Sequence, residues 1–372
     1  MKKLMIASAL VAASVLFAGC GGKPKIPANT VAAAYVDLDK AVWNTADVVE
    51  TIIGELPKEM RKEVEEEYEK FLDEHKKDIK AVDAEWACVT VEASKGSATP
   101  DVAVVVKCDC KEKIPSAGVS LEELAAVALK KVDTINGCDV YAYVESGFGS
   151  PMHKIAGCSG MCIAFVDGKY IVCTSVKGFV NDEAKAFAGR MIDLYKNGKG
   201  EKSGDFGDLT DLEDDTVLRI QTAEVATVAE ILGAKEQIEQ FGKEIDDEDL
   251  TDMFLDIENI TLDVNLSDDV LGFVYKVDAG SREFAKVVES SFNVAKFACR
   301  VYSSVGPAAL SDALSKVPLL SGIDGQTAKA ISKHAREAVE VDRSGSTATF
   351  TVELDTEDLI EDVVEALFSE GK

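Results

Sequence analysis

The sequence predicts an α+β fold of two tandem units, each a mainly antiparallel sheet packed with helices. Three observations support this prediction. Strand-like runs occur in pairs separated by polar turn residues, as in β-hairpins. Amphipathic segments with helical spacing and capping residues follow those pairs. The same order of elements then occurs a second time along the chain, which indicates a duplicated unit.

The first unit is expected over residues 29–196. Ser120 and Glu123 have the spacing of a helix capping box, Asp167 is followed by a glycine in a hairpin turn, and Asn181 caps the last helix. The predicted elements are a strand at 29–36 running into a helix, a charged helix at 58–80, a hairpin of strands 86–93 and 101–108, a helix whose stripe reaches Lys131, a hairpin of strands 163–166 and 170–174, and the last helix.

The second unit is expected over residues 215–372, after an exposed linker at 197–214 that is rich in Gly, Asp, Lys and Ser. Thr356 is the predicted cap of its final helix. The alternative to duplication is that this order of elements arises by chance in an α+β chain. The predicted elements are a strand at 215–222 with a helix, strands 259–266 and 270–277, a helix through 284–292, and strands 339–341 and 347–354 before the final helix.

The charge of the chain excludes some partners. There are 67 Asp and Glu against 40 Lys and Arg, a formal net charge of −27. Such a surface repels phosphate backbones, so nucleic-acid binding is not expected. The same charge argues against the protein body lying flat on anionic lipid.

The N-terminus has the layout of a signal peptide. A basic segment at 1–3 precedes an uncharged, mostly apolar run at 4–17. A helix of that length would reach only about 21 Å, less than the hydrocarbon layer of about 30 Å. Residues 16–20, ending at Cys20, resemble the lipobox of bacterial lipoproteins, although Phe17 stands where that family usually has leucine.

The lipobox resemblance implies that residues 1–19 are removed and that Cys20 carries diacylglycerol and an acyl chain such as palmitate. No other cofactor is expected. Residues 20–28 have the composition of a flexible tether. In this family the residue after the cysteine can direct sorting, and an aspartate there retains the protein in the inner membrane. Gly21 occupies that position here, which favours the outer membrane in a host with two membranes. The alternative is an ordinary secretory signal cut nearby.

The sequence shows no recognisable catalytic arrangement. Its histidines are His75, His153 and His334, which leaves few candidates for a general base. We therefore expect a non-enzymatic cell-envelope protein that binds or scaffolds. Its partner is the membrane, through the lipid, together with an unknown envelope protein or small ligand.

The remaining cysteines suggest an alternative function in soft-metal binding or thiol redox chemistry. Exported chains commonly oxidise such sets. If the first hairpin turns near Ala98, Cys88 lies opposite Cys108, and this predicts a disulfide. Cys108 and Cys110 are one residue apart, which fits neither a zinc ribbon nor a thioredoxin motif. Seven of these cysteines fall in the first unit and only Cys299 in the second.

The glycine-rich loop at 145–162 is the candidate metal site. It has thioether, imidazole and thiol groups, the ligands that copper(I) prefers. The alternative is a structural loop stapled by a disulfide. The candidate ligands are Met152, His153, Cys158, Met161 and Cys162.

Overall fold

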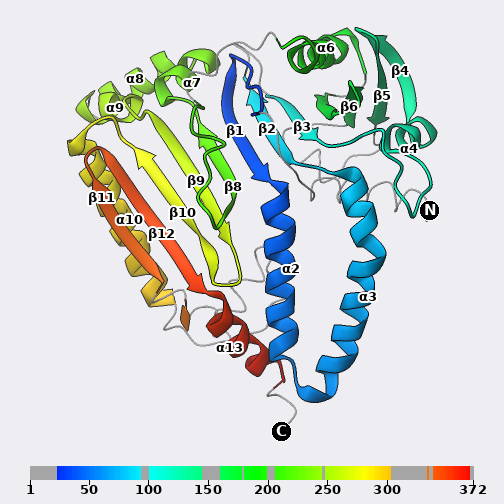
Figure 1. Cartoon of the computed structure of the whole chain (residues 1–372). Helices are drawn as coiled ribbons and strands as arrows, with labels where there is room; N and C mark the ends of the chain where they lie inside the picture. Colours follow the sequence, from blue (N-terminus) through cyan, green and yellow to red (C-terminus); the bar gives the residue numbers. More distant parts are fainter. Residues whose placement is uncertain are drawn as a thin grey trace. The chain divides into compact units, whose positions relative to one another are not determined.

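The computed structural model describes residues 23–93, 100–144, 160–177, 180–198, 206–244, 248–302, 333–334 and 338–368. These form two compact units. Unit 1 comprises the described residues within Met1–Val42, Lys70–Leu212 and Leu218–Asp247, and unit 2 those within Trp43–Glu69, Glu213–Val217 and Glu248–Lys372. Both combine antiparallel strands with helices (Figure 1), which confirms the predicted α+β class.

Unit 1 is built on a sheet with the strand order β8-β1-β2-β3-β7-β6-β5-β4. Each neighbouring pair is antiparallel. The strands are β1 (Thr30–Asp37), β2 (Trp86–Glu92), β3 (Asp101–Lys107), β4 (Lys130–Ile135), β5 (Cys138–Val144), β6 (Gly160–Val166), β7 (Tyr170–Val176) and β8 (Thr216–Thr222). The helices are α4 (Leu121–Ala128), α6 (Asp182–Asn197), α7 (Val225–Leu232) and α8 (Lys235–Glu244).

The capping signals of unit 1 are confirmed, but one helix is shorter than predicted. Ser120 and Glu123 form the capping box of α4, and the Asn181 side chain accepts a hydrogen bond from Ala184 N–H at the start of α6. However, α4 ends at Ala128, and Lys131 lies in β4, which pairs with β5. The tight turn between these strands is Asn136–Gly137, with positive φ at both residues, a strong hairpin signal that the periodicity of the apolar residues concealed.

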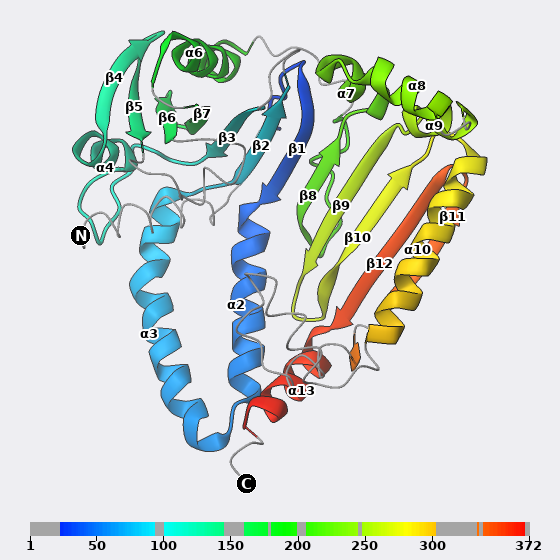
Figure 2. The same ribbon diagram turned by 180° about the vertical axis from the view of Figure 1, so that it is seen from behind.

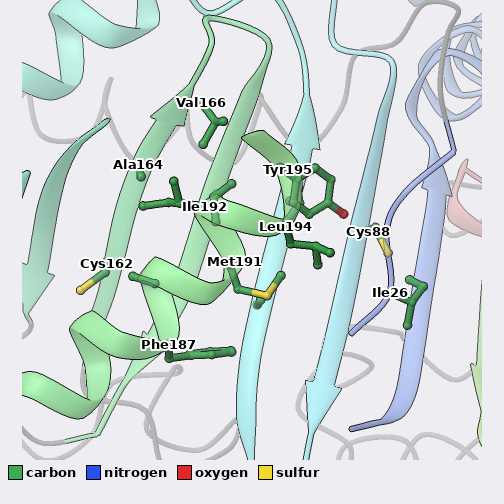
Figure 3. Packing of buried hydrophobic residues seen from close by; sticks show 14 of the residues in the cluster. Ile26, Cys88, Cys162, Ala164, Val166, Phe187, Met191, Ile192, Leu194 and Tyr195 are labelled. Atoms are coloured by element: carbon green, nitrogen blue, oxygen red, sulfur yellow. The ribbon is translucent and has the colours of Figure 1, made fainter. Parts of the chain in front are cut away.

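The sheet of unit 1 buries a hydrophobic cluster on each face, because alternate residues of a strand point to opposite sides. One cluster packs Phe187, Met191 and Ile192 of α6 onto the sheet (Figure 3) and includes Trp86 and Cys88. The other contains Leu38, Val82, Ala87, Val106, Cys108, Cys110, Ile114, Leu121, Ile163 and Ile171.

Two long helices, α2 (Leu38–Glu55) and α3 (Lys58–Val82), follow β1 and run antiparallel to each other (Figures 1 and 2). The turn between them contains Pro57, whose carbonyl accepts hydrogen bonds from Met60 N–H and Arg61 N–H. Tyr68 Oη donates to Ala46 O across the pair. The predicted charged helix is confirmed. No helix in the described part of the chain has the length and apolar character needed to cross a membrane.

Unit 2 contains strands in the order β11-β12-β10-β9, all antiparallel. Helix α10 packs alongside β11 and β12 on one face of this sheet (Figure 2). The Phe292 ring of α10 lies against Tyr275 and Phe350. Asp355 Oδ1, rather than the predicted Thr356, caps the last helix through Asp358 N–H, while Thr356 Oγ1 donates to Ser267 O. The elements are α9 (Glu248–Leu255), β9 (Asn259–Leu266), β10 (Val270–Asp278), α10 (Arg282–Tyr302), β11 (Val339–Ser344), β12 (Thr347–Asp355) and α13 (Thr356–Phe368).

The strand orders are compatible with a duplication, which stays a prediction. Unit 1 contains the series β1-β2-β3-β7-β6. In unit 2 the series β9-β10-β12-β11 has segment 213–217 at its β9 side, where Leu266 N–H donates to Asp215 O. In each series a single strand comes first, a hairpin follows it, and a second hairpin comes last. The later strand of the second hairpin is the one that pairs with the first hairpin. The hairpin β4–β5 extends only the first series.

Candidate functional site

The N-terminal segment that follows Cys20 is attached to unit 1. Ile26 is 4% exposed in the core cluster under α6. Lys25 N–H donates to Tyr195 Oη at 3.1 Å, and Tyr195 Oη in turn donates to Lys25 O at 3.2 Å. Lys25 Nζ donates to Leu194 O at 3.0 Å. The backbone at Lys25 is therefore held at both polar groups by one buried phenol.

Tyr195 is suited to this role because its ring is fixed by other aromatic side chains. Its centroid lies 5.2 Å from that of Tyr170 and 6.4 Å from that of Trp86. Burial raises the pKa of Tyr195 well above its ordinary value, with further contributions from Cys88 and Tyr170. The phenol therefore stays protonated and keeps its donor at physiological pH.

The predicted flexible tether is wrong for its described residues. Besides Ile26, Lys23 Nζ lies 2.8 Å from Asp211 Oδ1, and the hydrogen bond and charge of Lys23 lower the pKa of the Asp211 carboxyl. The predicted exposed linker at 197–214 is also partly packed, since Phe206 and Leu209 belong to the same core as Ile26. Composition indicated a flexible tether and an exposed linker, but isolated apolar residues pack the described parts of both segments against the core.

A second candidate site is the loop after β3, which contains two buried thiols. Cys108 is 4% and Cys110 0% exposed, and their Sγ atoms lie 3.4 Å apart. The hydrogen bond with Cys108 and then burial raise the pKa of the Cys110 thiol. Three consecutive amides hold the loop: Cys108 N–H donates to Lys169 O, Asp109 N–H to Val82 O and Cys110 N–H to Gly168 O.

The β6–β7 turn positions this thiol pair. Asp167 and Gly168 have φ of 54° and 70°, both in the left-handed region. Lys169 completes the turn before Tyr170 pairs with Val166, which confirms the predicted turn. That conformation directs the carbonyls of Gly168 and Lys169 at the cysteine amides. The side chain of Lys111 covers Gly168, where a Cβ would lie 2.6 Å from Lys111 Cδ.

The predicted register that paired Cys88 with Cys108 is wrong. Cys88 lies opposite Val105, and the two cysteines belong to the clusters on opposite faces of the sheet. Both are free thiols. The predicted register differs from the observed one by an odd number of residues, which exchanges the faces to which side chains point.

The predicted copper ligands are only partly described. Met152, His153 and Cys158 lie outside the described residues. Met161 and Cys162 are consecutive residues of β6, with Cys162 in the cluster under α6 and Met161 against the opposite one. These two side chains therefore do not serve one ion. Within the described ranges, no group of three or more His, Cys, Asp or Glu side chains could hold a metal.

Two histidines contact carboxylates, His334 between two segments of the chain and His75 within one helix. His334 Nε2 is 2.8 Å from Asp362 Oδ2, and Lys333 Nζ is 2.6 Å from the same oxygen. Lys333, followed by His334, lowers the pKa of the Asp362 carboxyl. His75 Nδ1 lies 3.9 Å from Asp78 Oδ2 within α3. The first arrangement joins residues 333–334 to α13, the second lies within α3, and neither needs a catalytic explanation.

No protein-family model and no curated protein sequence matches the chain. Among solved structures, crystal form I of TP0453 is similar over 95% of this chain and 96% of that one, with a TM-score of 0.35 and 9% identity. Crystal form III of TP0453 gives a TM-score of 0.36 and 6% identity over 95% and 97% of the two chains. Similarity at this level assigns neither a family nor a function.

Proposed function

We propose that the protein is a lipid-anchored component of the bacterial cell envelope, with a binding or scaffolding role, and that unit 1 is held close to the membrane surface. The lipobox-like segment ending at Cys20 supplies the anchor. The observation that supports close attachment is the docking of Lys25 and Ile26 on Tyr195 and the core of unit 1.

The number of residues between Cys20 and the docked segment limits the distance from the protein to the membrane. Three residue steps separate Cys20 from Lys23, and an extended chain covers at most about 3.6 Å per residue, or about 11 Å in total. Lys23 is itself paired with Asp211. A flexible tether over 20–28 would instead let unit 1 move through about 30 Å at full extension. The docked segment therefore sets the distance between the bilayer and the part of unit 1 around Asp211.

The proposal leaves the ligand open and names its class. An acidic protein attached through acyl chains presents a surface that repels anionic lipid headgroups, so its partner is another envelope protein or a small ligand rather than the bilayer itself. Placement in the outer membrane is part of the proposal and rests on Gly21.

Tryptic release from membranes tests the docked segment. Cleavage after Lys25 would free the protein from its lipid, whereas cleavage after Lys23 is blocked by Pro24. Tyr195→Phe removes both hydrogen bonds to the Lys25 backbone, which costs about 1 to 3 kcal/mol in local opening. We expect a new N-terminus at Ile26 to form about tenfold faster in Tyr195→Phe than in the native protein.

Tyr170→Phe is the matched control, because its ring lies beside Tyr195 and the substitution also removes one phenol oxygen from this aromatic cluster. It should release protein at the native rate. Equal rates in Tyr195→Phe and the native protein would show that the segment is not held in solution, and the short-anchor proposal would be wrong.

A further inference from the structure

The geometry of the loop after β3 points to a modification site, which rests on the proposed export of the chain but not on its lipid anchor. We infer that Cys108 and Cys110 form a dithiol that is oxidised to a disulfide across Asp109 in the exported protein. The structure shows this pair in its reduced form, with the sulfurs 3.4 Å apart.

The backbone permits closure of this bond. Two residue steps span at most about 7 Å when fully extended, and less in a bend, while disulfides accept Cα separations of about 4.4 to 6.8 Å. Asp109 bends the chain here, because its Oδ1 accepts hydrogen bonds from Lys111 N–H and Glu112 N–H. The sulfurs must then approach by little more than 1 Å to reach the bond length of about 2.05 Å.

The fold separates the other described cysteines from this pair. Cys88, Cys138 and Cys162 lie in the cluster on the opposite face of the sheet. Cys173 shares the face of Cys108, but it pairs with Val104, four residues before Cys108, or about 13 Å along the strand. Among the described thiols, Cys110 is therefore the partner within reach of Cys108.

The reaction requires a disulfide oxidant, either a small disulfide such as oxidised glutathione or a protein disulfide of the envelope. One cysteine thiolate attacks a sulfur of the oxidant and releases its other half as a thiolate. The second cysteine then attacks the protein sulfur of this mixed disulfide and releases the remaining half. The two protons lost by Cys108 and Cys110 end on the two released thiols, so two electrons pass from the protein to the oxidant.

Burial sets when the reaction occurs. Both sulfurs are covered, and the raised pKa of Cys110 disfavours the thiolate in the folded state. Oxidation therefore takes place before the loop is buried during folding, or during local opening. Once closed, the disulfide is shielded from external thiols by the same packing.

Trypsin gives a direct assay, since Lys107 and Lys111 bracket both cysteines and release residues 108–111 as one peptide. Protein is taken from the envelope fraction into acid without reductant, denatured and treated with iodoacetamide before digestion. We expect peptide 108–111 without label, and with two labels when reduction precedes alkylation. The peptides of Cys88, Cys138, Cys162 and Cys173 should be labelled without reduction.

The Cys108→Ala variant should expose Cys110 to labelling without reduction, whereas Cys173→Ala, the control on the same face, should leave peptide 108–111 unlabelled. If Cys108→Ala does not fold, the native protein decides alone. Two labels on peptide 108–111, after refolding of reduced native protein with oxidised glutathione and without later reduction, would overturn the inference. A crosslink from Cys108 or Cys110 to any other cysteine would also overturn it.

Discussion

Cys20→Ser is expected to abolish attachment of the protein to the membrane. Lipid transfer to a lipobox cysteine uses the thiol sulfur as nucleophile, and a serine hydroxyl is not ionised enough at neutral pH to replace it. Radiolabelled palmitate should therefore enter the native protein and not the Cys20→Ser variant, and the variant should accumulate with residues 1–19 still present.

Cys138→Ser provides the control, because it also replaces a cysteine in the exported chain and leaves Cys20 intact. It should incorporate palmitate at the native level. If Cys20→Ser is processed to the native N-terminus and appears as a free protein, the segment is an ordinary secretory signal. In that case Lys25 and Ile26 would only fix the N-terminal segment of a protein without lipid, and the proposed short anchor would be wrong.

Much of the fold follows from local signals in the sequence. The hairpin turn after Val166 was predicted because Asp167 and Gly168 are turn residues between two apolar runs, and both tolerate the positive φ found there. The caps Ser120 and Asn181 were predicted because their side chains satisfy free amides of the first helical turn. Such signals depend only on neighbouring residues, so they can be identified without the fold.

The candidate site was less predictable, because it depends on contacts between distant residues. Ile26 stands among Gly, Lys and Pro, and nothing nearby in the sequence shows that Tyr195 lies over Lys25. The close pair Cys108 and Cys110 was visible, but its spacing matches no common motif. The pair is assembled by amides that bond to Val82, Gly168 and Lys169, which only the tertiary structure brings together.

Gly272 in β10 is a second position where a substitution is expected to have a large effect, here on stability. On the flanking strands it lies opposite Asn265 and Glu353, and these side chains meet across it: Asn265 Nδ2 donates to Glu353 Oε1 at 3.3 Å. Thr216 Oγ1 in turn donates to Asn265 Oδ1 at 2.9 Å. A side chain at 272 would occupy the space that this hydrogen-bonded row uses, which explains a glycine in the middle of a strand.

Gly272→Ala is expected to destabilise unit 2 by about 3 kcal/mol or more, since overpacking of this kind adds to the loss of the partly buried Asn265–Glu353 hydrogen bond. A Cβ at this position would lie 2.0 Å from Val352 O and 2.9 Å from Glu353 Cα, and backbone atoms of a paired strand cannot move aside as a flexible side chain can.

Gly54→Ala in α2 is the control, and its expected effect has the opposite sign. Nothing lies within 4 Å of a Cβ at this position, so alanine should stabilise the helix by up to about 1 kcal/mol. Urea unfolding gives both free energies, and hydrogen exchange should show faster opening of β9, β10 and β12 in Gly272→Ala with β2 and β3 unchanged. Native stability in Gly272→Ala would mean that β10 and β12 do not approach this closely, and the register of unit 2 would then need to be reassigned.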